Sequence, residues 1–332
     1  MLTLITGANG FVGSAVLRLL LDEGHEVRAL VRAGSNRQNL ANLPVEIVEG
    51  DLTDSSSLKN AVTNCDYLFH VAADYRLWIP DPAQMYLTNV DGTRLLMQHA
   101  AEAGVKKAVY TSSVATLGIN ADLSPANETT PVSLDNMIGH YKRSKYLAEE
   151  EVHKLVASHQ LPVTIVNPST PIGPRDIKPT PTGRIIVDCL SGRIPAYVDT
   201  GLNIAHVDDV ARGHLLALEK GKIGERYILG GEDLTLKSIL GIICEIGQRK
   251  PPSISIPHNL ILPIAKLIEI WAGFTKVEPL TTVDGIRMAK KHMFFSSAKA
   301  IAELGYQSRP ARDALEDAIN WFVENNYCSI KK

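Results

Sequence analysis

The stretch TGANGFVG occupies residues 6–13, directly after the short apolar run Leu2–Thr6 and at the start of the helical pattern Phe11–Glu23. Glycines at this spacing permit a tight turn, let the backbone approach a pyrophosphate and let a helix pack closely against a strand. The first turn of the following helix offers unpaired N–H groups and a positive dipole end to phosphate. A glycine triplet alone could mark only a turn, but its place after the strand that opens the chain predicts a dinucleotide site. Its expected members are Gly7, Asn9, Gly10, Phe11, Val12 and Gly13.

Apolar runs and helical patterns alternate through the first half of the chain. Strands that are apolar on both faces and separated by helices predict an α/β fold with a doubly wound parallel sheet of the Rossmann type. The expected strands are Leu2–Thr6, His25–Val31, Val45–Val48, Tyr67–Val71, Lys107–Ser112 and Val163–Asn167, and the expected helices are Phe11–Glu23, Pro82–Ala103 and His140–Ser158.

The pattern changes after Asn167. Five prolines between residues 168 and 181 exclude a regular helix or a central strand, so the chain is expected to cross there into a second lobe. Ala205–Lys220 predicts a helix and Arg226–Leu229 a last strand, which return the chain to the first domain. We therefore predict a Rossmann domain of residues 1–168 plus about 203–230, and a smaller C-terminal substrate lobe of residues 169–202 plus about 231–330.

The composition argues against nucleic acid, a metal ion and a membrane span as partners of the chain. A net charge of −2 over 332 residues gives no basic surface for nucleic acid. Four scattered cysteines argue against a disulfide framework and a zinc site, so no metal is expected. No signal peptide is evident, and the most apolar late stretch, Leu260–Phe274, is interrupted and too short to span a bilayer. These features predict a cytoplasmic protein without a transmembrane segment.

Two arginines follow the second predicted strand, where a ribose-reading residue is expected. An acid would bind the 2′-hydroxyl of NAD, whereas Arg32 and Arg37 can pair with the 2′-phosphate of NADP. NADP is therefore favoured, with NAD and two solvated loop arginines left as alternatives. Asp51 closes the third strand and could accept a hydrogen bond from the adenine amino group, or it could be a turn residue.

Tyr141 and Lys145 lie four residues apart, so they share one face of a predicted helix. A phenol with a pKa near 10 is a poor base at neutral pH, and a nearby ammonium favours the phenolate. The lysine can also hydrogen-bond a cofactor ribose, and Ser113 can hold the substrate oxygen near the tyrosine. The pair alone could be two solvated side chains. Together with the glycine turn, the three residues predict hydride transfer to or from a carbonyl or alcohol carbon.

These motifs make the whole chain resemble an extended short-chain dehydrogenase/reductase. The residues that carry the resemblance are the glycine motif at 6–13, Asp51, Asn89, Ser113, Tyr141, Lys145, HVDDV at 206–210 and FSSAKA at 295–300. The resemblance implies that Tyr141 and Lys145 also contact the cofactor. It implies further cofactor contacts from Leu52, Ala72, Ala73 and Pro168.

Within that family the chain is similar to the dihydroflavonol 4-reductase-like branch, and most similar to the hopanoid-associated sugar epimerase group. The strings that carry this are HVAADYRLW at 70–78, YTSSVAT at 110–116, residues 167–184 and AYVDTG at 196–201. The group implies a sugar substrate linked to hopanoid lipid synthesis. Thr170 stands where many nucleotide-sugar members carry Asn, which favours the reductase branch. Tyr75 and Arg76 are predicted to line the substrate pocket together with Ser113 and Thr170, although Tyr75 and Arg76 could equally be loop anchors.

Three functions follow from this resemblance. The first is a reductase that consumes NADPH, and the second is an epimerase that returns the hydride to the other face of the substrate carbon. The third, a dinucleotide-sensing scaffold without catalysis, ranks last because the tyrosine and lysine are both present. The resemblance also implies a homodimer formed through Pro82–Ala103 and His140–Ser158. The apolar helix around Leu260–Trp271 is expected to pack the second lobe, or to touch a membrane if the substrate is a lipid.

Overall fold

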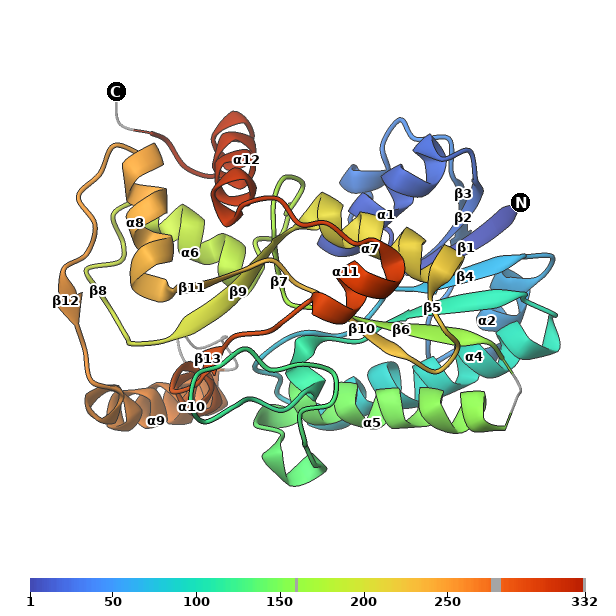
Figure 1. Ribbon diagram of the computed structural model, residues 1–332, viewed down its shortest axis with the longest axis horizontal. Coiled ribbons are helices and arrows are strands. Elements are labelled where there is room, and N and C mark those ends of the chain that lie inside the picture. Colours follow the sequence, from blue (N-terminus) through green and yellow to red (C-terminus); the bar gives the residue numbers. More distant parts are fainter. Residues whose placement is uncertain (159–160, 276–281, 331–332) are drawn as a thin grey trace.

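A computed structural model describes residues 1–158, 161–275 and 282–330 of the chain. Within these residues, the large sheet has seven strands in the order β10-β6-β5-β4-β1-β2-β3, and every neighbouring pair is parallel (Figure 1). The predicted Rossmann-type sheet is confirmed. Its strands are β1 (Leu2–Thr6), β2 (Glu26–Val31), β3 (Glu46–Glu49), β4 (Tyr67–His70), β5 (Lys107–Thr111), β6 (Val163–Pro168) and β10 (Arg226–Leu229).

Helices cover both faces of this sheet and bury one apolar stripe each (Figure 1). On one face lie α1 (Phe11–Asp22), α7 (Val207–Lys220) and α11 (Ala298–Leu304); on the other lie α2 (Ser55–Val62), α4 (Gly92–Glu102) and α5 (Gly139–Ala157). Leu17 of α1 and Leu96 of α4 are fully buried in the two cores. Each such leucine contributes about 1.5–3 kcal/mol by leaving water, which fixes the helices against the strands.

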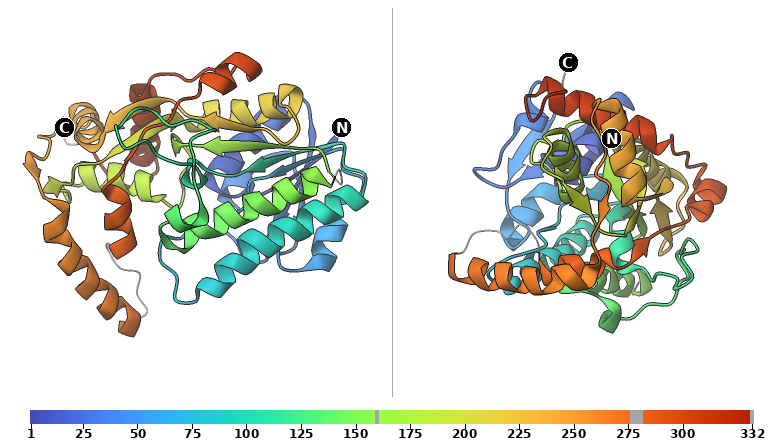
Figure 2. Two further views of the ribbon diagram at one scale, coloured as in Figure 1. Left: turned by 60° about the horizontal axis from the view of Figure 1, so that its bottom comes forward. Right: turned by 90° about the vertical axis from the view of Figure 1, so that its left-hand side faces the viewer.

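The small lobe lies at one end of the large sheet (Figure 2). In its main sheet β9 (Gly201–His206) pairs with β11 (Glu232–Thr235), β13 (His292–Met293) and β7 (Thr170–Ile172), and β8 (Ala196–Tyr197) pairs separately with β12 (Ile254–Ser255). The helices α6 (Pro181–Leu190), α8 (Leu236–Ile246) and α12 (Ala311–Glu324) share one apolar core. Two further helices in this part of the chain are α9 (His258–Thr275) and α10 (Val283–Ala289). The predicted boundaries between the two lobes stay a prediction.

Two predicted helices begin or run differently in the structure. Ala205–Lys220 is not one helix, because Ala205 and His206 end β9 and α7 begins at Val207; the His206 imidazole accepts a hydrogen bond from the Asp208 N–H at 3.0 Å and so caps the helix. Pro82–Ala103 is interrupted as well: α3 (Pro82–Tyr86) and α4 are joined by a π-helical segment, Leu87–Asp91. An amphipathic pattern does not reveal such a change in helical register.

Two strand expectations also need correction. Pro168 was expected outside any central strand, yet it closes β6, which pairs with β5 on one side and β10 on the other. At the last residue of a strand the ladder does not require the missing N–H. Arg226–Leu229 is the last strand of the large sheet only, since β11, β12 and β13 follow it in the small lobe. Among the described helices none has the length and hydropathy needed to cross a membrane.

Candidate active site

The glycine turn lies between β1 and α1. Gly7 has φ of +74°, and a side-chain carbon there would come within 2.8 Å of the Ala72 nitrogen, so only glycine fits. A side-chain carbon at Gly13 would overlap the Gly7 carbonyl. Gly10 donates to the Gly7 carbonyl at 2.9 Å and precedes α1 without a side-chain cap. The first turn of α1 therefore keeps N–H groups for an anion, and the backbone leaves room for a pyrophosphate to approach.

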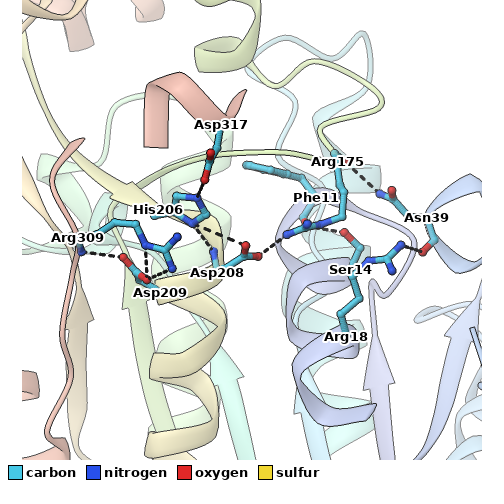
Figure 3. A network of polar contacts seen from close by, with 10 residues as sticks. All are labelled: Phe11, Ser14, Arg18, Asn39, Arg175, His206, Asp208, Asp209, Arg309 and Asp317. Carbon is cyan, nitrogen blue, oxygen red and sulfur yellow. Dashed lines mark hydrogen bonds and ion pairs between the residues drawn. The ribbon is translucent and has the colours of Figure 1, made fainter. Parts of the chain in front are cut away.

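A second group of residues surrounds the N-terminal end of α1 (Figure 3). The Asn39 side chain donates to the carbonyls of Asn9 and Arg175, at 3.3 and 3.2 Å, and Arg175 forms an ion pair with Asp208 at the start of α7. The Arg175 side chain lies beside Phe11 in Figure 3, and its backbone has φ of +75°. Sequence reasoning missed Arg175, since only the fold brings the loop after β7 to the glycine turn.

A cavity of about 620 Å³ opens beyond the ends of β2 and β3. Arg32 lines it, and within the described residues its guanidinium forms no hydrogen bond or salt bridge, although its charge reaches Asp74 and helps lower the pKa of that carboxyl. Arg37 instead pairs with Glu49. The lining residues are Arg32, Ala33, Gly34, Ser35, Glu49, Gly50, Asp51, Asp54 and Ser57. The cavity thus offers one available cation where an adenosine ribose is expected.

Asp51 has the turn role that the sequence left open. Its Oδ1 accepts from the Thr53 N–H at 2.9 Å and from the Thr53 hydroxyl at 2.7 Å. The same residue lines the cavity. Leu52 is buried and packs against Gly92 of α4. Asp51 is thus held by its own turn at the cavity wall, so the turn role and the predicted adenine contact are compatible.

The loop after β4 lies against the glycine turn, and the loop after β6 leaves the same edge of the sheet. The Ala72 N–H donates to the Thr6 hydroxyl at 3.1 Å, which fixes Ala72 and its neighbour Ala73 beside the turn. Ser169 follows Pro168, and its buried hydroxyl oxygen has no hydrogen-bond partner among the described residues. A buried polar atom without a partner at the carboxyl end of the sheet fits a polar ligand bound there.

The structure brings Ser113 and Tyr141 together. Ser113 lies two residues after the end of β5, and Tyr141 lies in the first turn of α5. Burial raises the pKa of the Tyr141 phenol above its usual value, and the hydrogen bond with Ser113 opposes this only in part. The sequence had predicted that Lys145 would lower this pKa. Desolvation instead raises this pKa, so the phenol keeps its proton at neutral pH.

Lys145 is almost fully buried, one turn after Tyr141. Its ammonium donates to the Thr111 carbonyl at 2.8 Å and to the Tyr110 hydroxyl at 3.0 Å. Burial lowers the pKa of Lys145 to about 7, and the charge of Glu149 opposes this. Lys145 therefore titrates near neutral pH, which is common at functional sites and rare for an ordinary lysine.

Glu149 lies one turn beyond Lys145 and was not expected from the sequence. Its carboxylate is buried and accepts from Ser112, Thr116, Asn167 and Arg226. Burial would raise the pKa of Glu149, but hydrogen bonds from His153 and Ser112 and the charge of Arg226 hold it below its usual value. The Asn167 amide also donates to the Ser113 carbonyl at 3.0 Å, so this cluster supports the strand end that carries Ser113. The only sequence signal was a glutamate on the helix face of Lys145.

Two of the predicted substrate residues, Tyr75 and Arg76, lie in the loop after β4, and a third, Thr170, lies in β7. Tyr75 is 44 % exposed, and Arg76 pairs with Asp74, its Nε lying 2.9 Å from the carboxylate. The Asn89 amide holds the Asp74 backbone by two hydrogen bonds of 2.7 and 2.8 Å. Arg76 therefore has the loop-anchoring contacts that the sequence left as an alternative. Thr170 lies in β7, paired with Ile204 of β9.

Comparison with known proteins agrees with this geometry. The model of the NAD dependent epimerase/dehydratase family matches residues 3–230. A putative dihydroflavonol 4-reductase of Synechocystis is 45% identical, covering 97% of this chain and 95% of the relative, and a sterol demethylase protein B of Methylococcus capsulatus is 37% identical, covering 98% and 99%. The solved structure of a nucleoside-diphosphate-sugar epimerase from Pseudomonas aeruginosa has a TM-score of 0.82 at 26% identity, covering 99% of each chain.

Proposed function

The chain belongs to the NAD-dependent epimerase/dehydratase family, and we propose that it acts as a reductase that transfers hydride from NADPH to a ketone carbon. It is an NAD(P)-dependent enzyme of the extended short-chain type, and its relatives include reductases and epimerases by name. The observation that carries the proposal is the half-buried, hydrogen-bonded Ser113–Tyr141 pair with the buried Lys145 one turn away.

The raised pKa of Tyr141 favours reduction. When bound, the nicotinamide supplies the hydride. Ser113 and Tyr141 would both donate hydrogen bonds to the substrate oxygen, and Tyr141 would give up its proton as negative charge develops there. A phenol that stays protonated at neutral pH is ready for this donation. Lys145 would hold the cofactor ribose and stabilise the phenolate that Tyr141 leaves behind, so that the proton can be replaced from solvent.

The preference for NADP rests on Arg32. A guanidinium pairs bidentately with a phosphate, and Arg32 lines the cavity beyond β2 with no salt bridge among the described side chains. Arg37 already neutralises Glu49 at the same wall, which leaves less negative charge to repel a 2′-phosphate. The predicted cofactor contacts of the glycine turn, Asp51, Leu52, Ala72, Ala73 and Pro168 belong to the same proposal.

Two relatives that cover nearly the whole chain are named for ring compounds, a dihydroflavonol and a sterol. This supports a cyclic ketone or its alcohol as the substrate class. The test is to mix the purified protein with NADPH and dihydroquercetin or a 3-ketosteroid and follow the loss of reduced-nicotinamide absorbance. Tyr141→Phe should lower kcat by about 100-fold or more, the share of a general acid. A Tyr141→Phe variant with wild-type kcat would refute the assigned chemistry.

The epimerase remains the second candidate, because a sugar epimerase with a known structure matches the chain over its whole length. An epimerase returns the hydride, so NADPH would not be consumed during turnover. Stoichiometric loss of NADPH would exclude simple epimerisation, including the hopanoid-linked sugar reaction implied by the sequence resemblance. A non-catalytic scaffold would show neither turnover nor an effect of Tyr141→Phe.

We also propose that two copies associate through α3–α4 and α5, of which α4 and α5 lie along the same face of the large sheet (Figure 1). Leu87, in the segment before α4, is 45 % exposed and would be covered in such a dimer. Light scattering at micromolar concentration should give twice the mass of the chain, and Leu87→Asp should reduce it to one. A cytoplasmic location stays part of the proposal.

A further inference from the structure

A continuous line of buried polar groups connects the glycine turn with Lys145. From the turn, the Thr6 hydroxyl contacts His70 Nδ1 at 2.8 Å, and His70 Nε2 contacts the Thr93 hydroxyl at 2.9 Å. The Thr93 hydroxyl also interacts with the Tyr110 phenol and lowers the pKa of that phenol, and the Tyr110 hydroxyl lies 3.0 Å from the Lys145 ammonium. All five side chains belong to residues that are at most 2 % exposed. The line crosses β1, β4, α4, β5 and α5.

The donors and acceptors of this line allow one arrangement of protons. The Thr93 hydroxyl has a single proton, and it lies 2.6 Å from the Asn89 carbonyl, which can only accept. Thr93 must therefore accept from both of its other partners, His70 and Tyr110. Burial and the charge of Lys145 lower the pKa of His70 to about 3, so its imidazole is neutral and carries its one proton on Nε2. Nδ1 then accepts from Thr6, which itself accepts from the Ala72 N–H at 3.1 Å.

Toward Thr93 the Tyr110 hydroxyl can therefore only donate, because the Thr93 proton already lies on the Asn89 carbonyl. The lone pairs of the Tyr110 oxygen face Lys145, so this hydroxyl is fixed as an acceptor for the ammonium. The Tyr110 ring adds to this, because the ammonium also lies 4.6 Å from the ring centroid. A tyrosine hydroxyl without other partners could turn its proton toward the lysine. The contacts of Thr93 with His70 and Asn89 disfavour that orientation of the Tyr110 hydroxyl.

We propose that Tyr110 is a positioning residue that holds Lys145 in place and keeps it charged, with Thr93 and His70 fixing the orientation of the Tyr110 hydroxyl. This inference rests on the proposed function, in which Lys145 binds the cofactor ribose. Tyr110 acts only through Lys145 and touches neither the cofactor nor the substrate in this scheme. Thr93 acts only through Tyr110.

The groups that set the charge of Lys145 come from every side of it. Tyr110 and the Thr111 carbonyl face it from β5, His70 from β4 and Glu149 from its own helix, and Tyr141 of that helix acts on Tyr110. The charge of Glu149 favours the ammonium and burial opposes it, whereas the neutral Tyr110 hydroxyl favours the ammonium by accepting its hydrogen bond. Loss of the Tyr110 acceptor should lower the pKa of Lys145 further. The charged form is then lost at lower pH.

The experiment measures the dissociation constant of NADPH by fluorescence across the neutral pH range, which needs no substrate. Wild-type affinity should fall as Lys145 loses its proton. Tyr110→Phe keeps the ring and should move the midpoint about one pH unit lower, the effect of one hydrogen bond to a charged group. Tyr227→Phe is the matched control, since Tyr227 is another fully buried tyrosine, hydrogen-bonded to Glu303 rather than to the site. Its midpoint should equal that of the wild type.

Thr93→Val gives a second, independent variant in case Tyr110→Phe folds poorly. It should shift the midpoint in the same direction by a smaller amount, and in the Tyr110→Phe background it should add nothing. The 2′-phosphate of NADPH also titrates near neutral pH, but equally in every variant. If Lys145→Met leaves the pH profile unchanged, the proposed function of Lys145 fails. If Lys145→Met leaves only the titration of the 2′-phosphate while Tyr110→Phe and Thr93→Val keep the wild-type profile, the positioning role alone is wrong.

Discussion

Lys145 and Glu149 are two buried charges one helical turn apart on α5, and their surroundings differ in how well they stabilise the charge. Glu149 accepts from four side chains and faces the cation of Arg226, so its pKa stays below the usual value despite burial. Lys145 has a carbonyl and a phenol as acceptors and is less compensated, so its pKa falls to about 7. The surroundings of Glu149 stabilise its charged form and so contribute to the stability of the fold. The surroundings of Lys145 destabilise its charged form, which is expected at a site where a bound ligand supplies the missing partners.

The largest effect on the free energy of unfolding is expected from removing the charge of Glu149. Glu149→Leu leaves Arg226 and several donors unpaired in the interior, which should lower the free energy of unfolding by about 3–5 kcal/mol. Chemical denaturation measures this. Glu151→Leu is the matched control on the same helix, where the carboxylate pairs with Lys154 at the surface, and it should leave the unfolding midpoint nearly unchanged. Equal losses in both variants would show that Glu149 has no special supporting role.

Removing the charge of Lys145 should change the free energy of unfolding in the opposite direction. Lys145→Met takes a buried ammonium out of the interior and replaces it by a flexible apolar side chain of similar length. We expect the free energy of unfolding at neutral pH to rise by about 2 kcal/mol, less than the full pKa shift implies, because two hydrogen bonds are lost. A Lys145→Met variant less stable than the wild type would mean that Lys145 contributes to the fold as Glu149 does.

The pH dependence of stability separates the two regions further. The pKa of Lys145 is lower in the folded protein than in the unfolded chain, so the unfolded chain binds more protons between about pH 7 and 10.5. The free energy of unfolding contributed by this group should therefore rise with pH across that window. Thermal unfolding of wild type and Lys145→Met should converge as the pH approaches the upper end. A difference that stays constant with pH would contradict the assigned titration.

The smallest effect is expected at the far end of the cofactor site. Arg32→Asp should weaken NADPH binding by about tenfold or more and change NADH binding little, since a guanidinium–phosphate pair contributes about 1.5–3 kcal/mol. Fluorescence titration with both cofactors measures the ratio. Arg37→Asp is the matched comparison and should have a smaller effect, because Arg37 is engaged with Glu49. Equal NADPH to NADH ratios in wild type and Arg32→Asp would exclude Arg32 as the selector.

Much of the fold could be predicted because its signals are local. The glycine turn at residues 6–13 depends on close backbone approaches that only glycine permits, and each strand of the large sheet was found to within about two residues of its predicted position. The Tyr141–Lys145 spacing places both residues on one helix by geometry alone. In contrast, the end of β9 was read as helix, because a short strand and a helix start share the same apolar pattern.

The sequence by itself thus determined the parallel sheet, the glycine cradle and the residues around which the chemistry would be arranged. Only the tertiary structure decided their electrostatics. The raised pKa of Tyr141, the lowered pKa of Lys145 and the low pKa of Glu149 all depend on burial and on partners from distant parts of the chain. Tyr110, His70 and Arg175 likewise lie near the site only because the folded chain brings distant segments together. Spacing along a chain fixes which side chains share a face, whereas desolvation and hydrogen-bond partners exist only once the elements have packed.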